Sequence, residues 1–167
     1  MKSFLLSFAI FYQVFSKELR GTTDRIVGGE EAAKGRYPYQ VALVSGDFQY
    51  CGGTLVDKDW VLSAAHCYGG KDKVFIGRHD LTNDSEEYES IEVDWETQHP
   101  QYNFDTVEND FMMVKLKQSS SFTPVKLDDG SNDLPSGFDV TVMGWVSACH
   151  IFSGGEIVHL HKLCIND

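Results

Sequence analysis

Two residues in this sequence have side chains suited to moving a proton. His66 lies in a Ser-Ala-Ala-His-Cys segment, and Asp110 stands immediately before the apolar run 111–116. An imidazole titrates near neutral pH, so it can take a proton from a hydroxyl group and return it later. A carboxylate that accepts the other ring N–H fixes the tautomer and stabilises the charged ring. We therefore expect His66 to be a general base and Asp110 to be its orienting carboxylate.

Each of the two residues also has a plainer interpretation. His66 could be a core histidine bonded to a backbone group, and Asp110 could be a turn residue that opens a strand. The Ala-Ala-His-Cys context favours the catalytic interpretation of the histidine. Asp105 is a second candidate for the partner carboxylate, but no apolar strand follows it. The sequence therefore favours Asp110.

Short β-prone runs surround these two residues and would have to position them. They cover 39–44, 53–56, 60–65, 73–76, 91–95 and 111–116, separated by glycine pairs and by the polar stretch 80–90. Six such runs, with no sustained helical period, predict one closed antiparallel barrel. A loop rich in Ser, Asp, Gly and Pro follows at 119–137. Beyond this loop, 140–145 and 157–163 are two more strand-like runs, too few to close a second barrel.

The N-terminal residues predict the compartment. Lys2 and the apolar run 4–15 are typical of a secretory signal peptide cleaved after Ser16. A buried helix or a membrane anchor is the alternative, but the run is too short to span a bilayer comfortably. Four cysteines also suit a secreted chain. The net charge of −11 argues against binding to nucleic acid or to anionic membrane surfaces. We expect a secreted protein with neither partner.

Several segments resemble the trypsin/chymotrypsin family of serine proteases. They are the segment around His66, the strand behind Asp110, the hexapeptide Asp24-Arg25-Ile26-Val27-Gly28-Gly29, and Met143-Gly144-Trp145. The resemblance implies an all-β fold of two antiparallel barrels, of which this chain holds the first whole and only the beginning of the second. The expected divisions are a signal peptide 1–16, a propeptide 17–25, a first barrel 26–118, a linker 119–137 and a partial second barrel with a divergent tail 138–167.

The same resemblance implies a function and further site residues. The chain looks like a secreted serine endopeptidase that hydrolyses peptide bonds through a His-Asp-Ser triad. A trypsin-like activating protease would cut between Arg25 and Ile26. Cys51 and Cys67 would form a disulfide beside the histidine, and the other two cysteines, Cys149 and Cys164, are a further candidate pair. The resemblance implies protein or peptide substrates and neither a cofactor nor a metal ion. His159 and His161 could form a ligand pair, but we interpret them as surface residues.

The family's nucleophilic serine has no clear counterpart in this sequence. In the family it lies within Gly-Asp-Ser-Gly-Gly-Pro, whereas Ser153 has two glycines after it but follows Ile151 and Phe152. We interpret this segment as a surface loop and expect the serine-bearing part to be missing, so that the chain alone is inactive. Two alternatives remain open. One is a non-catalytic, protease-like binding or decoy protein, and the other is a first barrel that serves as a stand-alone structural domain.

Overall fold

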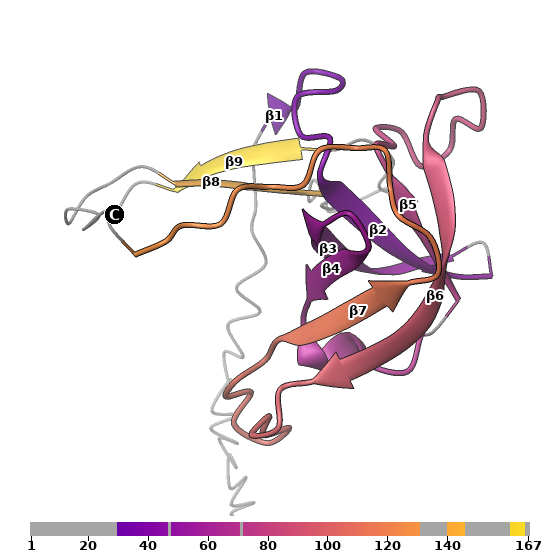
Figure 1. The fold of residues 1–167 in the computed structure, drawn as a ribbon. Helices are drawn as coiled ribbons and strands as arrows, with labels where there is room; N and C mark the ends of the chain where they lie inside the picture. Colours follow the sequence, from indigo (N-terminus) through magenta and orange to yellow (C-terminus); the bar gives the residue numbers. More distant parts are fainter. Residues whose placement is uncertain (1–29, 47, 71, 131–139, 146–160, 166–167) are drawn as a thin grey trace, which may run out of the picture.

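A closed antiparallel β-barrel forms the main body of the computed structural model (Figure 1). The structure describes residues 30–46, 48–70, 72–130, 140–145 and 161–165, with residue 140 and the last range described by their backbone alone. The barrel strands are β2 (Gln40–Ser45), β3 (Phe48–Asp57), β4 (Trp60–Ser63), β5 (Lys73–Ile76), β6 (Glu89–Gln98) and β7 (Met112–Leu116), in the spatial order β2-β3-β4-β7-β6-β5. The predicted all-β fold with a closed antiparallel barrel is confirmed.

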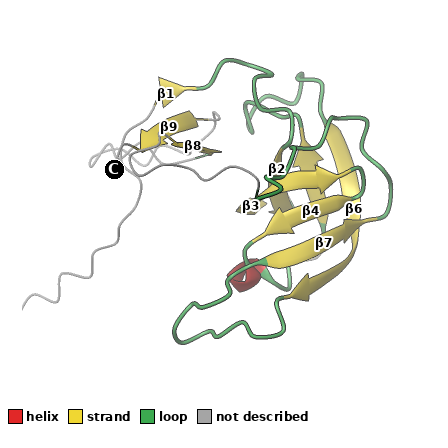
Figure 2. Cartoon of the chain, turned by 60° about the vertical axis from the view of Figure 1, so that its left-hand side comes forward, coloured by secondary structure: helices red, strands yellow, loops and turns green. Residues whose placement is uncertain are grey.

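The only helix in the described part of the chain is the short turn η1 (Ala65–Cys67), which follows β4 (Figure 2). No helix among those residues is long or apolar enough to cross a bilayer. The predicted run 73–76 coincides with β5, but β3 and β6 are longer than their runs of apolar residues. Pairing with a neighbouring strand requires only backbone groups, so a strand can continue through glycine and polar residues.

Alternate side chains of the barrel strands point inward and form one apolar core. In β7, for example, Met112, Val114 and Leu116 are buried while Met113 and Lys115 are only partly so. The buried cluster consists of Val41, Leu43, Leu55, Val61, Cys67, Val74, Ile76, Ile91, Val93, Met112, Val114 and Leu116. Burying one such aliphatic side chain contributes roughly 1.5–3 kcal/mol. This core fixes the positions of the strand ends that carry the site.

The side chains of strand β6 that point into the barrel switch from odd-numbered to even-numbered residues halfway along the strand. Ile91 and Val93 are buried, and continued alternation would bring Trp95 inside as well. The pairing with β7 instead shifts between Val93 and Trp95, which is a β-bulge. Trp95 is therefore 42% exposed, whereas Glu96 is only 7% exposed. The bulge thus turns a polar side chain into the barrel near the end of β6.

A small sheet lies beside the barrel (Figures 1 and 2). Its strands are β1 (Glu30–Glu31), β8 (Val140–Gly144) and β9 (His161–Ile165), in the order β1-β9-β8. Trp145, directly after β8, is buried against Ala42 and Val44 on the outer face of β2. Its ring N–H donates a hydrogen bond to the carbonyl oxygen of His79 at 3.0 Å. Strand β2 is buried on both faces as a result.

The chain after β7 packs along the barrel before it leaves the described residues. The backbone N–H of Ser120 donates to the carbonyl of Lys58, and that of Val125 donates to the carbonyl of Leu55. The ring of Phe122 covers Gly77, where an added Cβ would come within 2.1 Å of it. The first part of the segment interpreted as a linker, 119–130, is therefore bonded to the barrel at several points, and residues 131–137 lie outside the described part.

The loop between β5 and β6 is held by one buried carboxylate, that of Glu86. Its side chain is 4% exposed and bonds to Lys34 at 2.7 Å. It also accepts hydrogen bonds from the backbone N–H groups of His79, at 2.8 Å, and of Asp80, at 3.0 Å. Burial alone would raise the pKa of this carboxyl, but the bonds from Lys34 and from the two backbone groups outweigh it and lower the pKa from 4.5 to about 2. Protonation of Glu86 in acid should therefore weaken the bonds that hold this loop.

We expect Glu86→Gln to lower the free energy of unfolding near neutral pH by roughly 1–3 kcal/mol, because bonds to a charged acceptor are lost. A carboxyl whose pKa falls on folding stabilises fully above its unfolded pKa, here 4.5, and less as the pH falls toward 2. The difference between the variant and the wild type should therefore shrink over that window. Urea denaturation at about pH 6 and about pH 2.5 measures it. Glu87→Gln is the exposed control, and a difference independent of pH would contradict the assignment.

Candidate active site

The pairing of β4 with β7 brings His66 and Asp110 together although 44 residues separate them. Ser63, at the end of β4, lies opposite Met112, at the start of β7. Ala64 then extends the chain, and the turn η1 begins with Ala65, which is fully buried. A small side chain is needed at this buried position. The histidine therefore emerges from the barrel next to the residues that precede β7.

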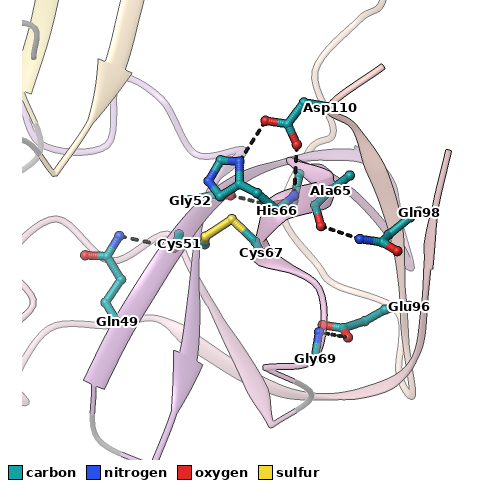
Figure 3. Close-up of a disulfide and its surroundings, with 11 residues drawn as sticks. Gln49, Cys51, Gly52, Ala65, His66, Cys67, Gly69, Glu96, Gln98 and Asp110 are labelled. Carbon is teal, nitrogen blue, oxygen red and sulfur yellow. Dashed lines mark hydrogen bonds and ion pairs between the residues drawn. A yellow bond between two sulfur atoms is a disulfide. The ribbon is translucent and has the colours of Figure 1, made fainter. Parts of the chain in front are cut away.

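The carboxylate of Asp110 contacts His66 at two points (Figure 3). One oxygen accepts the backbone N–H of His66 at 2.8 Å, and the other lies 2.7 Å from its Nδ1. An ionised carboxylate can only accept, so we assign the ring proton to Nδ1. The Nε2 lone pair is then left to accept a proton. With the side chain of His66 56% exposed, the imidazole is accessible to another molecule.

Local backbone geometry turns Asp110 toward the histidine. Asn109 has a φ of 57°, in the left-handed region that asparagine tolerates better than most residues. Its side-chain amide donates to the carbonyl of Gln101 at 3.0 Å, and its own carbonyl accepts the N–H of Phe111 at 2.8 Å. Asp105, the other candidate, lies in the exposed loop between β6 and β7 and bonds through its backbone N–H to Asn103. The structure thus pairs the histidine with Asp110.

The hydrogen bonds from His66 also affect the charge state of Asp110. Partial burial would raise the pKa of this carboxyl. The hydrogen bonds from the His66 ring and from its backbone N–H act the other way and prevail, so the pKa lies below its ordinary value of 3.8. At neutral pH the group is therefore a carboxylate, as its two accepted bonds require.

A disulfide between Cys51 and Cys67 ties the turn to β3. The two Cα atoms are 6.2 Å apart, and the bond closes a loop with a sequence separation of 16 residues. The two sulfurs and the ring of His66 lie within 4.8 Å of one another. Because the sulfurs are bonded to each other, they are not thiolates that could bind a metal ion. The disulfide thus serves to anchor the histidine turn.

Two further side chains at this site were not identified from the sequence. The amide of Gln98 donates to the carbonyl of Ala65 at 2.7 Å, and a carboxylate oxygen of Glu96 accepts the N–H of Gly69 at 2.9 Å (Figure 3). Both residues lie on β6 after its bulge. The bulge gives no clear signal in the sequence, because it is a property of the register between β6 and β7. Most residues of β6 are polar, so nothing in the sequence distinguishes Glu96 and Gln98 from the exposed residues of the strand.

Several residues singled out in the sequence lie outside the described part of the chain. They are Arg25 and Ile26 at the expected activation site, Ser153 with its two glycines, and Cys149 and His159. His161 and Cys164 belong to β9, where only the backbone is described. Activation cleavage and a second disulfide therefore stay predictions.

Comparison with known proteins gives a consistent result. The family model described as Trypsin matches residues 26–155. Trypsin I-P1 of Gallus gallus is 40% identical over 150 residues, which is 86% of this chain and 57% of the relative. Trypsin-2 of Salmo salar is 38% identical over 128 residues, covering 73% of the chain and 53% of the relative. Trypsin-4 of Rattus norvegicus is 45% identical over 94 residues, or 56% of the chain and 38% of the relative. The chain thus spans about half the length of the curated relatives it matches.

We expect His66→Ala to raise the pKa of the Asp110 carboxyl toward its ordinary value, because the ring hydrogen bond is the strongest of those that lower it. The rise should be incomplete, since the backbone N–H of residue 66 still donates. A ¹³C NMR titration of the aspartate carboxyl signals measures the change. His99→Ala, which removes a nearby ring that packs at a tilt against Phe111, is the control. An unchanged titration of Asp110 in His66→Ala would contradict the contact.

Proposed function

This chain belongs to the trypsin family of serine proteases, and we propose on that premise that it supplies the general base and the orienting carboxylate of a secreted serine endopeptidase. His66 is the base and Asp110 its partner. Substrates would be proteins or peptides. The single observation that carries the proposal is the two-point contact between the Asp110 carboxylate and His66.

The contact suits the proton transfers of acyl-transfer chemistry. A neutral His66 with its proton on Nδ1 presents Nε2 as an acceptor for the proton of a serine hydroxyl. As the hydroxyl oxygen attacks a peptide carbonyl, the ring becomes an imidazolium, and the Asp110 carboxylate stabilises that charge. The imidazolium then returns the proton to the leaving amine. Water hydrolyses the acyl-enzyme by the same base catalysis.

The nucleophile in this proposal comes from residues other than the 167 of this chain. No Gly-Asp-Ser-Gly-Gly segment occurs among them, and the one Ser-Gly-Gly, at 153–155, lacks the preceding glycine and aspartate. The oxyanion hole and the pocket that selects the substrate would come with the nucleophile. These 167 residues alone would therefore lack peptidase activity.

Secretion and activation complete the proposal. Residues 1–16 would direct secretion, and a trypsin-like protease would cut between Arg25 and Ile26 to free a new N-terminus. The disulfide at the site supports this compartment, since structural disulfides persist in oxidising surroundings. N-terminal sequencing of the secreted protein, before and after treatment with a trypsin-like protease, tests both cleavages.

We expect the 167-residue chain to show neither a burst of product from a peptide ester nor labelling by a serine-directed phosphonate, because both need an activated serine. Mass spectrometry of the intact chain measures the labelling. A labelled chain would contradict the proposal, and peptide mapping would show which serine had reacted.

We expect a chimera, in which the second-barrel portion of a trypsin relative follows Trp145, to hydrolyse peptide esters. His66→Ala and Asp110→Asn should each lower its kcat about 10²–10⁴-fold, the usual contribution of a positioned general base. Asp105→Asn is the matched control and should leave kcat unchanged. A chimera that folds and hydrolyses the ester equally well without His66 would overturn the assigned role, and a folded but inactive chimera would favour a binding or decoy protein.

A further inference from the structure

Two side chains of β6 hold the backbone on either side of His66. We propose that Gln98 and Glu96 are positioning residues, which set the orientation of the His66 ring by fixing the turn that carries it. The proposal rests on the function proposed above, because an exact ring orientation matters only if the ring transfers protons. Neither residue contacts the ring, so neither is assigned a catalytic role.

The turn has few bonds of its own. Turn η1 is three residues long, and no side chain caps its start. Its local hydrogen bonds are those from the N–H groups of Cys67 and Tyr68 to the carbonyls of Ala64 and Ala65, both 3.1 Å long. So short a segment gains little from helix formation itself. Its geometry must therefore be fixed by the surrounding strands.

Successive residues of the turn are fastened to different parts of the barrel. Ala65 is held through its carbonyl by Gln98, and His66 through its N–H by Asp110. Cys67 is held by the disulfide to Cys51 on β3. The N–H of Gly69, just after the turn, is held by Glu96. The two bonds from β6 thus lie before and after His66, and Figure 3 shows them on the same side of the turn.

Glu96 is a costly residue for the barrel interior. It is 7% exposed, and its Oε1 is buried with no hydrogen-bond partner among the described residues. Burying a carboxylate with so few partners opposes folding, and an apolar residue would serve the core better. The bond to Gly69 is the contact that the carboxylate adds. This is the pattern expected of a residue that serves the site at the expense of stability.

The chain after the turn fits closely against the same region. Gly69 has a φ of 103°, and a Cβ on Gly70 would lie 1.9 Å from the ring of Tyr50. Burial, followed by the charges of Glu96 and Asp72, raises the pKa of the Tyr50 phenol to about 12, so that it stays neutral. Gly70 is therefore packed against Tyr50, while Gly69 has a positive φ and donates its N–H to the Glu96 carboxylate.

The alternation of side chains along β6 supplies a matched control. Thr97 lies between the two positioning residues on the same strand, but its side chain is exposed. Thr97→Ala therefore tests the effect of altering β6 without touching the turn. Glu96→Gln is the conservative variant, because the amide oxygen of glutamine can still accept the N–H of Gly69.

The test is NMR of the full chain with its disulfide formed. Gln98→Ala and Glu96→Ala should shift or broaden the downfield Nδ1–H signal of His66, which reports the contact with Asp110. In Glu96→Ala the hydrogen-exchange protection of the Gly69 amide should also fall roughly tenfold. Protection of the amides of Val61 and Val114, in the paired barrel strands, should persist. Thr97→Ala should match the wild type, and Glu96→Gln should restore most of the signal.

Unchanged Nδ1–H signals in Gln98→Ala and Glu96→Ala, with only a lower free energy of unfolding, would overturn the proposal and leave both residues as barrel supports. If Glu96→Ala does not fold, Gln98→Ala and Glu96→Gln decide the matter. The readout needs no hydrolysis, so it can succeed even if the protein has no peptidase activity. In the chimera described above, Gln98→Ala should lower kcat with little effect on KM. An active chimera whose kcat is unchanged by Gln98→Ala would contradict the positioning role alone, whereas a folded but inactive chimera would contradict the proposed function.

Discussion

The contact between the Asp110 carboxylate and His66 is the interaction on which the rest of the site depends. It has two parts, one to the backbone N–H and one to the ring, so it constrains both the position and the orientation of the imidazole. The bond to the backbone N–H adds to the restraints that the disulfide and β6 place on the turn, and the bond to the ring limits rotation of the imidazole. The barrel makes both possible by pairing the end of β4 with the start of β7.

Carboxylates have a similar role elsewhere in this acidic chain. Glu86 accepts two backbone N–H groups of the loop after β5, and Glu89 accepts the backbone N–H of Ser121 after β7. Asp72 accepts the N–H of Gly46 in the turn between β2 and β3. Loops lack the regular hydrogen bonds of strands, and an ionised side chain is a strong acceptor for their N–H groups. Some of the carboxylates that give the chain its net charge of −11 therefore hold loops against the barrel.

The histidine-aspartate pair, to which the proposed function assigns proton transfer, is held in place at several points. The histidine turn is held by a disulfide, by Asp110 and by two side chains of β6, while the ring itself remains accessible. Such pre-organisation is useful in catalysis because the cost of ordering the groups is met during folding and not during the reaction. On this view the serine-bearing part would meet a base that is already oriented.

Much of this arrangement could be predicted from the sequence, because the relevant signals are local. Runs of β-prone residues predicted the six barrel strands, and the residues around His66 and Asp110 indicated both the pair and the family. The bulge in β6 is different, since it depends on which residue of β7 each residue of β6 faces. That register decided that Trp95 would lie outside and Glu96 inside. The packing of Trp145 on β2 and of Phe122 over Gly77 likewise joins segments far apart in the chain. The sequence by itself determined which groups could do the chemistry, whereas cross-strand pairing and packing decided which groups hold them in place.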